Sequence, residues 1–332
     1  MKGAAQFWLD SLVRDQGNLT FLTSPSCTPD DGPFTEGSAL DQQLIWQLFN
    51  NTLAATTILS ESDKVFVNNL TTTLEGLSSG LKIGHWGQIQ EWNLDLDIPR
   101  EFHRYLGPLW AVYPGHQIFF VSTNSSNNNN NRTQEELLKA AQWTLENRGE
   151  GVTEDNLGWA KSWRAVMWAR LGDGSKAYKA LNLFKKNNLK YKNLLNFEEG
   201  FSGQLGFGAA IVEMVIQSRA PGYLDVLNNA ETGLPERWLK AGSVQGFRTR
   251  DGHNVTAKWE ETKVRSVEVA APLKAGELRV RIGTLKGEEE TPSEKVHVSI
   301  KGSTKKVEYT READVVVLTV SKGQTYVIEI DP

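Results

Sequence analysis

The sequence predicts a multidomain protein in which a mostly helical region precedes a smaller antiparallel β domain. Apolar residues recur at helical spacing through residues 1–220. After Pro221 the spacing changes to alternation of apolar and polar residues, which is typical of strands with one buried face. The length of 332 residues is sufficient for two buried cores. We therefore expect one domain over residues 1–225 and a second over residues 226–332.

Apolar stripes predict the helices of the first region, and long loops separate them. Thr133 and Glu136 form a capping box, which predicts a helix start. Long loops within a compact domain are typically functional or disordered, and we expect them over residues 17–38, 83–118 and 186–204. The stripes comprise Ala4, Trp8 and Leu12; Leu44, Ile45, Leu48 and Phe49; Trp159, Trp163, Val166 and Met167; and Leu205, Ala209, Val212 and Ile216.

Alternating residues predict the strands of the second region. The pattern is clearest in residues 277–282, 296–300 and 326–330. Glycine-containing and charged turns separate these runs, as expected for an antiparallel sandwich.

Charge and cysteine content exclude several classes of partner. The net charge of −4 favours neither nucleic acid nor an anionic membrane surface. No apolar run reaches the roughly 18 residues that a membrane helix needs. The five histidines and the single cysteine, Cys27, lack the spacing of metal ligands. We therefore expect no metal, cofactor, nucleic acid or membrane partner.

Glycosylation sequons indicate an extracellular location. Because no signal peptide precedes the first expected helix, the sequence predicts that an N-terminal part of a longer protein is missing. The six N-x-S/T sequons begin at Asn18, Asn50, Asn69, Asn124, Asn131 and Asn254.

Tryptophan is unusually frequent, with 11 residues in the chain. The flat apolar ring of tryptophan, with its polar edge, is suited to contact with sugar rings. The alternative is that most of these residues pack in the helical core.

Six segments carry long motifs of polar, aromatic and glycine residues. In this order they resemble the motifs of glycoside hydrolase family 95, the inverting α-L-fucosidases, which include some α-L-galactosidases. The segments are MKGAAQFWLDSLV (1–13), TSPSCTPDDGPFTEGSALDQQLIWQLFNN (23–51), IGHWGQIQEW (83–92), FHRYLGPLWAVYPGHQI (102–118), GWAKSWRAVMWARLGDGSKAY (158–178) and SGQLGFGAAIVEMVIQS (202–218).

The resemblance implies a fold and a substrate. The family has an (α/α)₆ barrel between two β domains, so the chain is expected to hold a partial (α/α)₆ toroid followed by a small antiparallel β-sandwich. The implied partner is carbohydrate, a fucosylated oligosaccharide or glycan. The family's upstream β domain, its first barrel helices and its paired-asparagine motif are absent from this sequence.

The resemblance assigns the two catalytic positions to Asp30 and Ser202. Inverting hydrolysis needs two carboxyl groups about 6.5–9.5 Å apart. Asp30 occupies the general-acid position, where the family has glutamate, although a solvated loop aspartate is the alternative. Ser202 occupies the general-base position, where the family has aspartate, and a serine has no carboxylate to accept the proton. Glu198 and Glu199 lie just upstream and are alternative sources of a base.

Five retained residues are candidates for sugar binding. By resemblance these are Glu91, Trp92, His103, Arg104 and Trp159. A carboxylate beside an indole suits hydrogen bonding to sugar hydroxyls with the ring stacked on the sugar. The alternative is that Glu91 ends a helix and Trp92 packs in the core.

Other motif positions depart from the family. Tyr105, Gly107 and Pro108 replace a histidine, a serine and a second histidine, and Gln204 replaces an asparagine. The resemblance thus implies a secreted glycoside hydrolase of the α-L-fucosidase type that acts with inversion on terminal α-linked fucose or a related sugar. The alternative is a catalytically inactive relative or a carbohydrate-binding fragment, which Ser202 favours.

Overall fold

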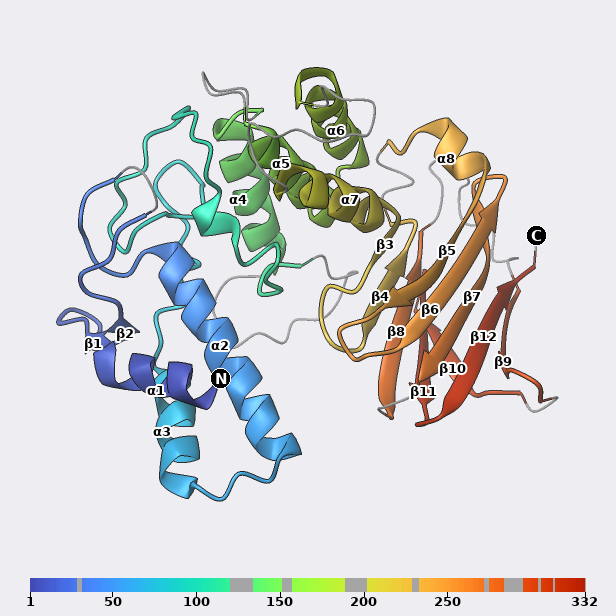
Figure 1. The fold of residues 1–332 in the computed structure, drawn as a ribbon, viewed down its shortest axis with the longest axis horizontal. Coiled ribbons are helices and arrows are strands. Elements are labelled where there is room, and N and C mark those ends of the chain that lie inside the picture. The colour runs from blue at the N-terminus through green and yellow to red at the C-terminus, as the bar shows by residue number, and fades with distance from the viewer. Residues whose placement is uncertain are drawn as a thin grey trace. The chain divides into compact units, whose positions relative to one another are not determined.

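The computed structural model describes most of the chain, and the described residues form two compact units. The units are Met1–Glu154 and Asp155–Pro332, and each is described by itself (Figure 1). The described ranges are 1–28, 32–119, 134–150, 157–188, 202–228, 233–271, 275–283, 295–303, 306–312 and 314–331.

The first unit is helical with long connections. Three of its helices pack around a small apolar core formed by Ala5, Ile45, Phe49, Phe66, Leu70 and Leu77. The predicted loop at 83–118 is confirmed, with one short 3₁₀ helix inside it. The elements are α1 (Lys2–Ser11), β1 (Val13–Arg14), β2 (Phe21–Leu22), α2 (Ala39–Ile58), α3 (Lys64–Glu75), η1 (Gly107–Leu109) and α4 (Gln134–Asn147).

Side-chain caps define where two of these helices begin. The hydroxyl of Ser38 accepts a hydrogen bond from the backbone amide of Asp41 at the start of α2, and Asp63 accepts one from Phe66 at the start of α3. The expected cap residue Thr133 lies outside the described residues, and Glu136 falls in the first turn of α4.

In its described residues, the second unit begins with three helices. They are α5 (Gly158–Arg170), α6 (Gly174–Asn188) and α7 (Ser202–Val215), and a short helix α8 (Glu236–Lys240) follows. The stripe predicted for α7 is wrong in part, because Leu205 is 74% exposed. The buried residues of α7 include Gly203 and Ala210, since α7 packs on α5 through its small residues.

Gly206 lies at the contact between α7 and α5, and a Cβ there would come within 2.8 Å of the Cβ of Ser162. We expect Gly206→Ala to lower the free energy of unfolding by about 1–2 kcal/mol because the helices must separate. Gly208 lies on the same helix with open space around it. The same substitution there should raise stability by about 0.5–1 kcal/mol. Urea unfolding of both variants measures the two changes in the free energy of unfolding. Equal effects at Gly206 and Gly208 would contradict the close contact of α7 with α5 at Gly206.

Two five-stranded sheets complete the second unit. One has the order β10-β11-β8-β4-β3, and the other β5-β6-β7-β12-β9 (Figure 1). The described ladders are antiparallel except for the parallel pairing of β4 with β8, which the expectation of an antiparallel domain missed. The strands are β3 (Ile216–Gln217), β4 (Tyr223–Val226), β5 (Ala241–Arg248), β6 (Asn254–Glu260), β7 (Lys263–Ala271), β8 (Gly276–Ile282), β9 (Val296–Ile300), β10 (Tyr309–Glu312), β11 (Val315–Val320) and β12 (Gln324–Ile330).

All three strands that alternation predicted are present, as β8, β9 and β12. In β12 the alternate residues Tyr326, Ile328 and Ile330 are buried, so one face of that strand contributes to the core. No helix in the described part of the chain is long and apolar enough to cross a membrane.

Candidate functional site

The candidate residues are divided between the two units. Glu91, Trp92, His103 and Arg104 belong to the first unit, and Trp159 and Ser202 belong to the second. Asp30 and the alternative bases Glu198 and Glu199 lie outside the described residues. The sharing of one cleft by all these residues stays a prediction.

Glu91 is buried, with an exposed fraction of 3%. Its backbone carbonyl accepts a hydrogen bond from Ala39 (2.8 Å), the first residue of α2. Its backbone amide donates to Oδ2 of Asp97 (3.0 Å). Its carboxylate oxygen Oε2 accepts a hydrogen bond from the guanidinium of Arg148, which directly follows α4. Glu91 therefore joins three segments that are far apart in the sequence.

Asp97 is the second acid of this cluster, and only 6% of it is exposed. The guanidinium of Arg148 lies 3.8 Å from its Oδ1 atom. Burial and the neighbouring charge of Glu91 raise the pKa of Asp97 from 3.8 to about 6, against the lowering effects of the Glu91 amide and of Arg148. Sequence reasoning missed Asp97 and Arg148, because neither lies at a motif position that it assigned.

The raised pKa of Asp97 predicts a pH-dependent stability. The folded protein holds the proton more tightly than the unfolded chain does, so the stabilisation is complete below pH 3.8 and is lost as the pH rises through 6. We expect the free energy of unfolding to fall as the pH rises from about 4.5 to about 7.5. This fall should be about 2 kcal/mol larger for the unchanged protein than for the Asp97→Asn variant. Thermal melts of both proteins across this range measure the difference. Parallel pH profiles would contradict the prediction.

Trp92 is also buried, with 8% exposed. A Cβ on Gly32 would come within 2.9 Å of the Trp92 ring, and Gly32 has a φ of +135°. The indole therefore packs against the loop that leads from Asp30 towards α2. Its Nε1 atom is buried and has no hydrogen-bond partner among the described residues. This packing agrees with a core position, and sugar contact by Trp92 stays a prediction.

The loop before Asp30 is anchored on α2. Ser26 and Thr35 exchange backbone hydrogen bonds of 2.7 and 2.8 Å, which close the loop at its base. The hydroxyl of Ser26 donates to the carboxylate of Asp41 (2.7 Å). Cys27 is exposed and free within this loop.

His103 and Arg104 are half-buried on the loop that leads into η1. The Nδ1 atom of His103 accepts a hydrogen bond from the amide of Tyr105 (3.2 Å). The guanidinium of Arg104 lies 5.8 Å from the centre of the Tyr105 ring. The far end of this loop is fixed by Gln43, whose side chain donates to the Pro108 carbonyl (2.8 Å).

The first turn of α7 packs against the start of α5, although the two segments are far apart in the sequence. A Cβ on Gly203 would lie 3.3 Å from the backbone nitrogen of Trp159. The hydroxyl of Ser162 donates to the carbonyl of Gly203 (2.7 Å), which ties the first turn of α7 to α5. Trp159 and Trp163 place their rings 6.4 Å apart. The backbone next to Ser202 therefore packs against the backbone at the start of α5, where Trp159 lies.

Ser202 is exposed at the first position of α7. The first turn of α7 contains no acidic residue. A neutral serine hydroxyl cannot take the proton of an attacking water as a carboxylate does. The first turn of α7 therefore offers no carboxylate that could act as a general base.

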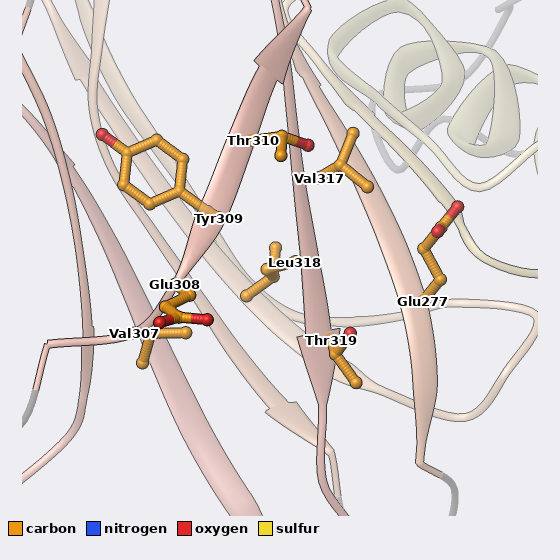
Figure 2. Close-up of a pocket in the computed structure, with 8 residues that line it drawn as sticks. All are labelled: Glu277, Val307, Glu308, Tyr309, Thr310, Val317, Leu318 and Thr319. Carbon is orange, nitrogen blue, oxygen red and sulfur yellow. The ribbon is translucent and has the colours of Figure 1, made fainter.

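A hollow of about 590 Å³ lies in the β region, and none of the candidate residues named above lines it. Figure 2 shows its walls on β8, β10 and β11. Within the described residues, no group of three or more histidine, cysteine or acidic residues could hold a metal ion. The lining residues of the hollow are Glu277, Val307, Glu308, Tyr309, Thr310, Val317, Leu318 and Thr319.

Comparison with known families defines the class of protein. Residues 1–215 match the Glycosyl hydrolase family 95 catalytic domain, and residues 217–328 match the Glycoside hydrolase family 95, C-terminal domain. The helical part and the β part are thus the two regions of a glycoside hydrolase. The chain belongs to glycoside hydrolase family 95.

Three relatives of known name are similar to most of the chain. Proteins named probable alpha-fucosidase A are 36% identical over 80% of this chain in Aspergillus niger and 30% identical over 73% in Aspergillus oryzae. Alpha-L-fucosidase 2 of Arabidopsis thaliana is 28% identical over 79% of this chain. The matched parts are 34%, 34% and 31% of these relatives, so the chain spans about a third of their length.

Solved structures are more distant. A GH127 beta-L-arabinofuranosidase from Geobacillus stearothermophilus T6 aligns with 98% of this chain and 57% of its own, at 13% identity and a TM-score of 0.29. The GH127 beta-arabinofuranosidase BT3674 aligns with 89% of this chain and 43% of its own, at 10% identity and a TM-score of 0.24.

Proposed function

We propose that this protein is a glycoside hydrolase of the α-L-fucosidase type that removes terminal α-linked fucose, or a related sugar, from extracellular glycans with inversion. The observation that carries the proposal is the family match over both regions, together with relatives named as fucosidases. Six sequons and plant and fungal relatives support an extracellular location. The partner is then a fucosylated carbohydrate.

In this proposal the catalytic domain is part of an (α/α)₆ toroid, and the two sheets form a β-sandwich. The domain boundary is proposed at residues 225 and 226. Buried residues at alternate positions of β12 support sheet-on-sheet packing. In a toroid the loops at one end gather at one mouth, which would bring Asp30 together with Ser202.

The proposed roles follow the resemblance and the local geometry. Asp30 protonates the leaving oxygen, and Ser202 occupies the place of the base. His103, Arg104 and Trp159, which are only partly buried, are the better placed of the candidates to contact sugar. Glu91 and Trp92 are buried and are therefore the less accessible of the candidates.

Ser202 favours a second candidate function for the chain as it stands. A site without a base binds the sugar but does not hydrolyse it. The second candidate is therefore an inactive family member that keeps carbohydrate binding.

Sugar binding tests both candidates at once. We expect ligand-observed NMR titration of the full chain to show binding of L-fucose and at least about tenfold weaker binding of D-fucose, its mirror image, because a shaped site discriminates hydrogen-bond geometry. Hydrolysis of an aryl α-L-fucoside, measured in parallel, separates the enzyme from the binding protein. Equal response to the two enantiomers would contradict the proposed function.

A further inference from the structure

The chemistry proposed above leaves the buried cluster of Glu91, Asp97 and Arg148 unexplained, although Glu91 is itself a candidate for sugar binding. All three side chains are at least nine-tenths buried, with exposed side-chain fractions of 4%, 4% and 9%. A buried ion pair costs desolvation, and an apolar replacement of the same shape is often at least as stable. Stability alone therefore gives no strong reason for an ionic cluster in this position.

Residues 102–107 form the loop that leads into η1 and carries His103 and Arg104. One end of this 102–107 loop packs against the cluster. The carboxylate oxygen Oε1 of Glu91 would lie 3.7 Å from a Cβ on Gly107. Gly107 begins η1 and is buried. The other carboxylate oxygen of Glu91 is held by Arg148. Arg148 therefore fixes the carboxylate against which the loop packs at Gly107.

The other end of the loop packs against the residue that follows Arg148. Gly149 has a φ of +72°, and a Cβ there would come within 2.5 Å of the Phe102 ring. The turn formed by Arg148 and Gly149 thus meets both ends of the 102–107 loop, one through Glu91 and one directly. His103 and Arg104, the proposed sugar contacts, lie between these two points.

We propose that Arg148 is a positioning residue that, through Glu91 and the adjoining Gly149, holds the 102–107 loop in the shape that presents His103 and Arg104 to a sugar. Asp97 completes the hold by accepting the backbone amide hydrogen of Glu91. The role in sugar binding rests on the proposed function. The hold on the loop rests only on the contacts above.

Hydrogen exchange of the full chain tests the hold without any ligand. Arg148→Met removes the guanidinium, and Arg148→Lys keeps the charge but loses the planar fork. We expect amides in peptides spanning the 102–107 loop to exchange about tenfold faster in Arg148→Met, because local opening becomes easier. In Arg148→Lys the exchange rate should lie between those of the unchanged protein and Arg148→Met. Gly149→Ala places a Cβ against the Phe102 ring at a φ of +72° and should also speed exchange in the loop.

Arg170 provides the matched control. It is buried and forms an ion pair with Glu213 (2.6 Å), outside the candidate residues. Arg170→Met should lower the melting temperature but leave exchange in the 102–107 loop unchanged. If Arg148→Met and Arg148→Lys lower stability without a local increase in exchange, the positioning role is wrong.

L-Fucose titration of the same variants adds the ligand. At a temperature where every variant is folded, we expect Arg148→Met to weaken L-fucose binding about fivefold to tenfold, and Arg170→Met to leave it unchanged. Absence of L-fucose binding by the unchanged protein would overturn the proposed function. Hydrogen exchange would still show whether Arg148 fixes the 102–107 loop. If Arg148→Met speeds exchange in the loop but leaves the affinity for L-fucose unchanged, the loop does not position residues for sugar binding.

Discussion

Ser202→Asp is expected to raise the hydrolysis of an aryl α-L-fucoside by about 10²–10⁴-fold, the usual contribution of a positioned general base. The increase should appear when the chain is joined to the upstream part of the catalytic domain from the Aspergillus niger relative, which is 36% identical to it. The chain alone should show little or no turnover, with or without the substitution. The physical reason is that a carboxylate at position 202 supplies the proton acceptor that a hydroxyl cannot.

Ser202→Asn is the matched control for this experiment. Asparagine has nearly the shape of aspartate but accepts no proton, so the fusion carrying it should stay inactive. Inversion predicts that NMR of the reaction mixture detects β-L-fucose first. Turnover by the unchanged chain that Asp30→Ala abolishes would show that Ser202 is compatible with catalysis, and the base assignment would then be wrong.

Asp225→Ala is expected to cost about 3–5 kcal/mol of the free energy of unfolding, because it leaves a buried cation without its partner. Asp225 lies in β4, and its two carboxylate oxygens accept hydrogen bonds of 2.6 Å from Arg219. Both side chains are almost fully buried, at 2% and 3% exposed. Arg281 of the neighbouring strand β8 lies 3.9 Å from the same carboxylate.

The control is an ion pair at the surface of the same sheet. Glu312 of β10 accepts a hydrogen bond of 3.1 Å from Arg279 of β8, and their side chains are 56% and 30% exposed. Glu312→Ala should therefore change stability by no more than about 1 kcal/mol. Denaturant unfolding of the second unit measures both variants. If Asp225→Ala lowers the free energy of unfolding by less than about 1 kcal/mol, then water or a local rearrangement solvates the buried guanidinium.

Local periodicity was sufficient to predict most of the elements. Alternation predicted the strands β8, β9 and β12, and helical spacing predicted α2 and α5. These predictions succeeded because the spacing of apolar residues within one element reflects a single buried face. The prediction for α7 failed in part at Leu205, because packing through glycines selected another face of that helix.

The sequence by itself determined the family and the element types, since each depends on residues that are close in the chain, and it is also the source of the proposal that Ser202 stands at the base position. Only the tertiary structure decided that β4 pairs in parallel with β8, that Ser162 of α5 is bonded to Gly203 of α7, and that Glu91 is bonded to Arg148, 57 positions away. Such pairings depend on the path of the backbone between distant segments. Local patterns contain no information about that path, so the partners of a buried charge emerge only when the chain is folded.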